Sequence, residues 1–214
     1  VAVENGVIRK QDPYGEIESM PYPFSPIYQQ LAGASHRFVF LRCPYRRLIS
    51  SFLDKVLKHE LVAKEVSVHY CNGKPPGEIS FHDFVAGIFK KREAYLNIHW
   101  IPQSQFLIYE RYDHYYSLEN MKDAVEHLES WIDFELIDVS TQKRHDLKRL
   151  ERDQSPDNHL RSVAFLREQK VRYQRAPSYE SMLNSEIIEW IDKAYKQDLD
   201  LYRRVSDESN LLVN

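Results

Sequence analysis

Residues 38–50 read FVFLRCPYRRLIS and carry the signal for a strand that leads directly into a helix. The run over residues 36–41 has the composition and length of a buried strand, and Pro44 suits the first position of a helix, where its missing N–H costs nothing. Apolar side chains then recur every four positions over residues 48–56. This pattern predicts a helix that continues to about Glu60.

A strand followed by a helix in this way predicts an anion site at the junction. Arg42 would lie at the carboxyl end of the strand, beside the free N–H groups and the positive dipole end of the helix. Ser50 lies about two turns into the helix, and its hydroxyl would reach back to the same anion if the helix presents that face. The alternative interpretation is a basic helix start with a buried serine.

The segment from Arg42 to Ser50 resembles the 3′-phosphate-binding motif of sulfotransferases that use 3′-phosphoadenosine-5′-phosphosulfate (PAPS), in particular the carbohydrate type. It contains the motif's Arg, Pro and second Arg, and its Ser stands eight positions after the first Arg. Residues 97–103 resemble the His-Trp-x-Pro-Gln segment of the same family, and residues 195–202 resemble its closing Tyr-x-x-Asp-x-x-Leu-Tyr pattern. The three segments occur in the family's order and span most of the chain.

The resemblance implies an α/β fold with a P-loop-kinase-like parallel sheet flanked by helices and a helical C-terminal part, in a single domain over residues 1–214. The alternation of strand and helix patterns agrees with this fold class, in which ligands bind at the carboxyl ends of strands. Residues 106–109 are expected to form a further strand. Residues 1–35 contain several prolines and are expected to be irregular.

Further helices are indicated by local patterns. Ser80 and Ser117 are suitable N-caps for helices over residues 81–91 and 118–131. A terminal helix is expected over residues 185–205, with one apolar face that packs against the core.

The sequence departs from the family in two places. The family's second phosphate loop, a strand with a Pro-Lys-x-x-x-Thr/Ser-like turn that holds the 5′-phosphosulfate, has no counterpart here, because the one lysine before His36 is Lys10, in an unsuitable context. We expect that this loop lies upstream of Val1 or was lost. Cys43 stands where the family often has Asp, and a thiol caps a helix or supports an arginine less well than a carboxylate does.

The resemblance implies transfer of a sulfuryl group from PAPS to a hydroxyl of a carbohydrate-like acceptor, with 3′-phosphoadenosine 5′-phosphate (PAP) as product and no metal. Arg42 and Ser50 would hold the 3′-phosphate. His99 is the first candidate for the base that takes the acceptor's proton, because imidazole titrates near neutrality. Glu16 and Glu18 are the alternative bases, and a purely structural role is the other interpretation of His99.

Two other functions are weighed against this one. A non-catalytic relative would bind a nucleotide or glycan without transferring sulfate, and the missing loop favours it. A P-loop nucleotide kinase is disfavoured because the sequence lacks Gly-x-x-x-x-Gly-Lys-Ser/Thr. The basic segment 143–175 would line the donor or an acidic glycan, or else form a solvated helical face.

Composition excludes several classes. The 214 residues are 43% hydrophobic, which is enough for a sizeable core, and the net charge of −3 argues against a general nucleic-acid binder. No apolar run approaches the ~18 residues of a membrane span. Two cysteines are too few for a disulfide framework, although a pair between Cys43 and Cys71 stays open, and there is no glycosylation sequon. We therefore expect a cytoplasmic, microbial protein and hold a Golgi lumenal domain as the alternative; the acceptor and the oligomeric state stay open.

Overall fold

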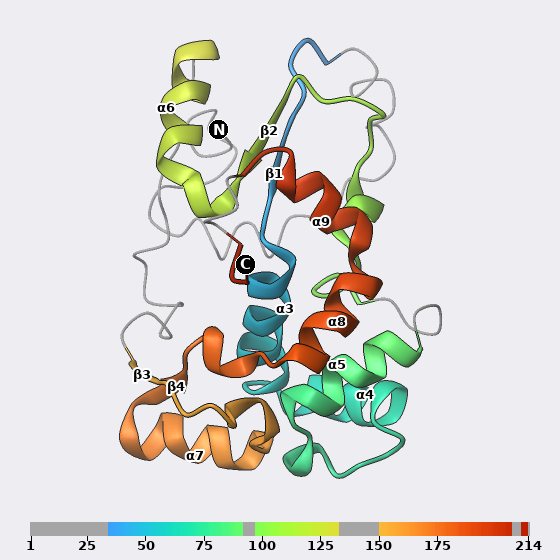
Figure 1. Cartoon of the computed structure of the whole chain (residues 1–214), viewed down its shortest axis with the longest axis vertical. Coiled ribbons are helices and arrows are strands. Elements are labelled where there is room, and N and C mark those ends of the chain that lie inside the picture. Colours follow the sequence, from blue (N-terminus) through green and yellow to red (C-terminus); the bar gives the residue numbers. More distant parts are fainter. Residues whose placement is uncertain (1–33, 92–96, 133–149, 207–210, 214) are drawn as a thin grey trace.

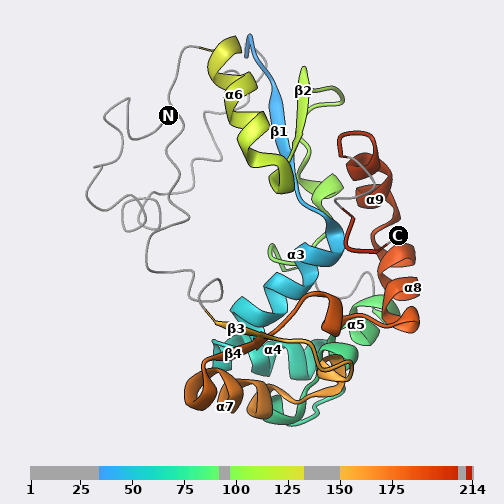
Figure 2. The ribbon, with the colours of Figure 1, turned by 60° about the vertical axis from the view of Figure 1, so that its left-hand side comes forward.

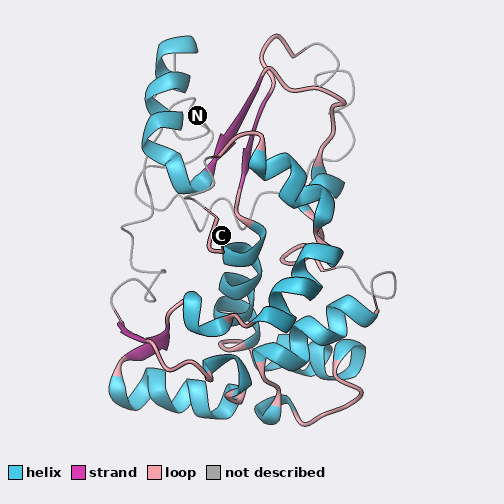
Figure 3. Cartoon of the chain, viewed as in Figure 1, coloured by secondary structure: helices cyan, strands magenta, loops and turns pink. Residues whose placement is uncertain are grey.

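The computed structural model describes residues 34–91, 97–132, 150–206 and 211–213. Helices dominate this part of the chain, and its strands are short (Figure 3). The α-helices are α3 (Pro44–Ser51), α4 (Glu60–Tyr70), α5 (Phe81–Lys90), α6 (Met121–Trp131), α7 (Val163–Tyr173), α8 (Ser185–Ala194) and α9 (Lys196–Arg203). The strands are β1 (Phe38–Leu41), β2 (His114–Ser117), β3 (Glu151–Asp153) and β4 (Arg175–Pro177). The irregular segment expected over residues 1–35 lies almost entirely outside the described residues.

The described strands form two small parallel pairs. β1 lies beside β2, with Phe38 opposite His114 and Leu41 opposite Ser117. β3 lies beside β4, far from the first pair in Figure 1. The described residues therefore form a mixed α/β structure with small parallel sheets, as the alternating pattern predicts.

The strand expected over residues 106–109 is wrong. The 3-10 turn Gln103–Phe106 comes first, and the next strand forms at β2 instead. The backbone N–H of Ile108 donates to the Tyr112 hydroxyl at 2.9 Å, so it does not enter a ladder. Pairing with β1 starts at Asp113, whose carboxylate accepts the Arg37 N–H at 2.7 Å and whose own N–H donates to the Arg37 carbonyl at 2.7 Å. Residues 114–117, which Asp113 anchors beside β1, therefore form the strand in place of the apolar run over residues 106–109.

The helix after β1 begins at Pro44, as expected, with Cys43 as its N-cap residue. Its apolar stripe is fully buried, which confirms the four-residue spacing. The α-helix changes at residue 52 to a π-helical segment, Phe52–Val56, and the chain leaves it before the expected end, because α4 begins at Glu60. Arg167 of α7 donates to the carbonyls of Val56 and Leu57 at this end.

Figure 1 shows α3 descending from β1 toward the other helices, and Figure 2 shows the same path from another side. α4, α5, α7 and α8 lie around and below it, and α5 packs along α8. Phe52, Phe81 and Phe84 are fully buried at the centre of this body. Gly87 lets α5 approach α4 closely, since a Cβ there would lie 2.4 Å from the Tyr70 carbonyl oxygen.

Helix caps follow the sequence pattern. Ser80 and Asp83 form a reciprocal capping box at the start of α5. Ser117 accepts the Glu119 N–H at 3.1 Å and begins a 3-10 turn, Leu118–Asn120, that leads into α6. The expected terminal helix is divided into α8 and α9 at Tyr195.

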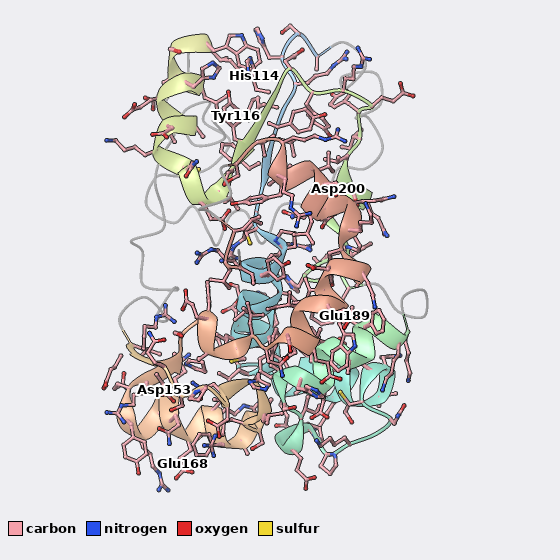
Figure 4. The ribbon with its side chains drawn as sticks, in the orientation of Figure 1. His114, Tyr116, Asp153, Glu168, Glu189 and Asp200 are labelled. Atoms are coloured by element: carbon pink, nitrogen blue, oxygen red, sulfur yellow. The ribbon has the colours of Figure 1, made fainter. Side chains whose placement is uncertain are left out.

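α6 covers one face of the first strand pair. His114 and Tyr116 project from β2 toward it (Figure 4). The His114 ring lies 4.2 Å from that of Trp131, and the Tyr116 hydroxyl lies 2.6 Å from Nδ1 of His127. This packing fixes β2, and with it the turn that follows Ser117.

Cys43 and Cys71 are both free thiols. No described helix is long and apolar enough to cross a membrane.

Candidate anion-binding site

Arg42 lies at the junction of β1 and α3, and its backbone is held by one side chain. The Gln103 amide accepts from the Arg42 N–H at 2.9 Å and donates to the Arg42 carbonyl at 2.8 Å. Gln103 belongs to the His-Trp-x-Pro-Gln segment. Two bonds to the two polar groups of a single residue fix the direction in which that residue's side chain leaves the backbone.

The Arg42 guanidinium is partly exposed and contacts two side chains from distant parts of the chain. Its Nε lies 3.8 Å from a carboxylate oxygen of Glu119, and an Nη donates to the Tyr179 hydroxyl at 3.5 Å. Glu119 also accepts the backbone N–H of Cys43 at 3.2 Å, at the start of α3. Glu119 therefore brings a carboxylate from the turn after β2 to the start of α3.

Two more arginines converge on Tyr179. The guanidinium carbons of Arg46, on α3, and of Arg152, on β3, each lie 5.9 Å from the centre of the Tyr179 ring. Nε of Arg46 is buried without a hydrogen-bond partner. Arg152 donates to the Pro177 carbonyl at 3.3 Å. Neither arginine forms an ion pair within the described residues. In this part of the chain, half-buried Arg46 and exposed Arg152 therefore lie beside Arg42 without an acidic partner.

Ser50 extends this row along α3. It follows Arg46 by four positions, so the two side chains share a face of the helix. Ser50 is half-buried, and its hydroxyl makes no hydrogen bond within the described residues. Its neighbour Ser51 differs, because it donates to the His99 carbonyl at 2.7 Å. The structure thus places both sequence-predicted ligands, Arg42 and Ser50, on the side of the helix start where Arg46 lies.

The arrangement fits a phosphate. Planar guanidinium groups bind phosphate oxygens in pairs, and the start of a helix adds backbone N–H groups and the positive end of its dipole. A buried guanidinium nitrogen without a partner is costly, and an anion would satisfy it. Among the described residues, no three His, Cys, Asp or Glu side chains are grouped so that they could hold a metal ion.

Comparison with known protein families shows to which family the chain belongs. The model of the sulfotransferase family matches residues 8–203, which is most of the chain. The chain belongs to the sulfotransferase family. No curated protein and no solved structure matches it.

In this member of the family, His99 lies beside the later part of α3. Burial, and then the positive charge of Lys55, hold the pKa of its imidazole below the ordinary 6.5. Ser51, which bonds its carbonyl, is the last residue of α3 and lies about 10 Å along the helix from Pro44. No contact joins His99 to Arg42 in the described chain. A low pKa keeps the imidazole neutral and able to accept a proton at neutral pH, and its role as base stays a prediction.

The other candidate bases, Glu16 and Glu18, lie outside the described residues. Arg47, the second arginine of the doublet, has an anchoring role: it donates to the carbonyl of Ile101 at 2.6 Å and to that of Ile98 at 3.1 Å. Burial lowers its pKa. It holds the His-Trp-x-Pro-Gln segment against α3.

The described cations of the basic segment 143–175 lie in different environments. Arg161 and Arg175 form exposed ion pairs with acidic neighbours, as expected for a solvated face. Arg167 caps the π-helical segment. Arg152 alone among these described cations faces Tyr179 together with Arg46. Residues 143–149 lie outside the described part of the chain.

Sequence reasoning missed Arg46, Glu119, Tyr179 and Arg152 as members of the site. The four-residue spacing from Arg46 to Ser50 was a usable signal for the first of them. For the others the sequence offered none, since they reach α3 from segments more than 70 positions away.

Proposed function

We propose that the chain binds the 3′-phosphate of PAPS through Arg42, Arg46, Arg152 and Ser50, and that it transfers the sulfuryl group of PAPS to a hydroxyl of a carbohydrate-like acceptor. The observation that carries the proposal is the convergence of three arginines on Tyr179 beside the start of α3. The position of the site, at the carboxyl end of the parallel strand β1, supports a P-loop-kinase-like arrangement.

Family membership supports sulfuryl transfer in general, and the site's chemistry supports the choice of donor. The residues of the site would hold a phosphate that does not react, and so would orient the donor. Correct orientation of two reactants is itself a large part of catalysis. The 3′-phosphate and the sulfate lie on opposite sides of the ribose in PAPS. A base that acts at the sulfate end therefore has no need to touch Arg42, and the position of His99 agrees with such a role.

His99 would then take the proton from the acceptor hydroxyl as the bond to sulfur forms. Its imidazole is half-buried and its pKa is lowered, which favours at neutral pH the neutral form that accepts a proton. Glu16 and Glu18 remain alternatives for this step. The cation that stabilises the leaving phosphate has no candidate in the sequence before β1.

A non-catalytic relative is the second candidate function. Such a protein would bind the nucleotide or a glycan at the same arginines and would not transfer sulfate. Both candidates predict nucleotide binding, and they differ in turnover.

Calorimetric titration tests the shared part. PAP should bind more tightly than adenosine 5′-monophosphate, and PAP at 100 times its dissociation constant should add ~2.7 kcal/mol to the free energy of unfolding. Equal affinities for both nucleotides would refute the 3′-phosphate assignment. Transfer from labelled PAPS to a panel of glycans then separates the candidates: product identifies an enzyme, and tight PAP binding without product identifies the non-catalytic relative.

A further inference from the structure

The closing Tyr-x-x-Asp-x-x-Leu-Tyr pattern forms a buried polar face. Tyr195, Asp198 and Tyr202 are spaced by three and four positions, so they lie on one side of α9 and the residue before it. All three are at most 3% exposed. Buried hydroxyl and carboxylate groups are costly unless they are hydrogen-bonded, so their partners show what the pattern is for.

Both carboxylate oxygens of Asp198 accept hydrogen bonds from the segment that holds Arg42. One oxygen accepts the Gln103 N–H at 2.6 Å, and the other accepts the Ser104 N–H at 2.8 Å. These two N–H groups lie at the start of the 3-10 turn, where the turn itself offers them no acceptor. Tyr195 donates to the Trp100 carbonyl in the same segment at 2.5 Å. α9 therefore fixes the backbone from which the Gln103 side chain reaches Arg42.

Tyr202 holds the other partner of Arg42. Its hydroxyl lies 2.9 Å from Glu119 and 3.0 Å from the Ser117 hydroxyl. Burial raises the pKa of Tyr202 to about 12, so this hydroxyl stays protonated and donates to the Glu119 carboxylate. Glu119 in turn pairs with the Arg42 guanidinium and accepts the Cys43 N–H.

We infer that Gln103 and Tyr202 are positioning residues for Arg42: Gln103, itself held by Asp198, sets the backbone of Arg42, and Tyr202 sets its guanidinium through Glu119. This inference rests on the proposed function, because it assumes that Arg42 binds the 3′-phosphate. Two paths of polar contacts start on one helix face and end on Arg42: the path through Gln103 consists of hydrogen bonds, and the path through Glu119 ends in the 3.8 Å ion pair. The segment around Gln103, the turn at Glu119 and α9 are distant in the sequence. Together they set the direction of the Arg42 guanidinium.

Stability alone does not require this arrangement. Buried polar groups and ion pairs can often be replaced by well-packed apolar side chains without loss of stability. A positioning role does require polar groups, because their directional bonds must hold the Arg42 side chain within a narrow range of directions. The effect should therefore appear in the recognition of the 3′-phosphate, and it should disappear when Arg42 is absent.

The test is a double-mutant cycle on the full 214-residue chain. Gln103→Met removes both bonds to Arg42 and keeps a side chain of similar length. Gln105→Met is the matched control, because Gln105 lies on the same turn and is exposed. Gln103→Met should reduce PAP affinity by about tenfold and leave adenosine 5′-monophosphate affinity unchanged. In an Arg42→Ala background the same change should have almost no effect on PAP affinity.

Tyr202→Phe provides an independent variant, with the exposed Tyr173→Phe as control. It should lower the preference for PAP over the monophosphate, again only when Arg42 is present. A Gln103→Met chain that is folded and keeps the full wild-type preference would overturn the inference and leave the proposed function intact. A wild-type chain that has no preference for PAP would refute the proposed site, and the inference with it.

Discussion

Removal of Arg46 should affect the free chain and the nucleotide complex in opposite directions. Its buried Nε has no hydrogen-bond partner, and an unsatisfied buried donor costs about 1–3 kcal/mol. The contact with the Tyr179 ring that Arg46→Met would remove is worth about 0.5–1 kcal/mol. Methionine keeps much of the packing of the aliphatic stem. We therefore expect Arg46→Met to raise the free energy of unfolding of the free chain by about 1 kcal/mol.

The same change should weaken PAP binding. A hydrogen bond from a charged group contributes about 1.5–3 kcal/mol, and 1.4 kcal/mol corresponds to a factor of ten in affinity. The dissociation constant for PAP should rise by roughly 10- to 100-fold. A stabilised protein that binds its ligand less well is the signature of a cation kept for the ligand at a cost to the fold.

Denaturant unfolding of the free chain and calorimetric titration with PAP measure the two effects. The matched control is Arg47→Met, because Arg47 donates to the carbonyls of Ile98 and Ile101. This change at the next position should destabilise the free chain and alter PAP affinity less. If Arg46→Met destabilised the free chain and left PAP affinity unchanged, Arg46 would be a structural cation and the site would be misassigned.

Three further outcomes are expected. Arg42→Ala should weaken PAP binding more than Ser50→Ala in parallel titrations, because charge-assisted bonds to phosphate are about twice as strong as neutral ones; the reverse order would contradict the assignment. Burial lowers the pKa of His99 in the folded chain, so the unfolded chain binds more protons just below pH 6.5. Unfolding stability should accordingly fall as the pH decreases through that range, and His99→Gln should reduce this dependence, whereas an unchanged pH profile would argue against the shift. In transfer assays with labelled PAPS, His99→Gln should lower turnover more than PAP affinity, and full turnover would return attention to Glu16 and Glu18.

The parts of the fold that the sequence predicts are those set by neighbours in the chain. Pro44 at the helix start, the capping box of Ser80 and Asp83, and the buried stripe of α3 all depend on interactions within a few positions. The run over residues 106–109 has a strand-like composition, yet a strand also needs a partner. Asp113 secures that partner for the next segment, through bonds to Arg37 that no local pattern reveals.

The candidate site shows the same limit. Arg42 and Ser50 are recognisable because their spacing belongs to one strand and one helix. Arg152 and Tyr179 approach them through the pairing of β3 with β4, over more than a hundred positions. The carboxylate expected at position 43 is absent from that position, and Glu119 supplies it from another segment. A sequence comparison confined to one motif would count Cys43 as a loss, whereas the hydrogen bonds show a replacement.

The charge of the cluster matches that of a phosphate monoester. Arg42, Arg46 and Arg152 carry three positive charges, and Glu119 compensates one of them through its contact with Arg42. Two positive charges remain. A phosphate monoester carries about −1.5 to −2 at neutral pH. The cluster therefore matches in charge the phosphate that we propose for it. The 5′-phosphosulfate also carries about two negative charges, one on its phosphate and one on its sulfate, so the assignment to the 3′-phosphate rests on the position of Arg42 and Ser50 at the start of α3. The comparison of PAP with adenosine 5′-monophosphate, which lacks the 3′-phosphate, is the direct test of that assignment.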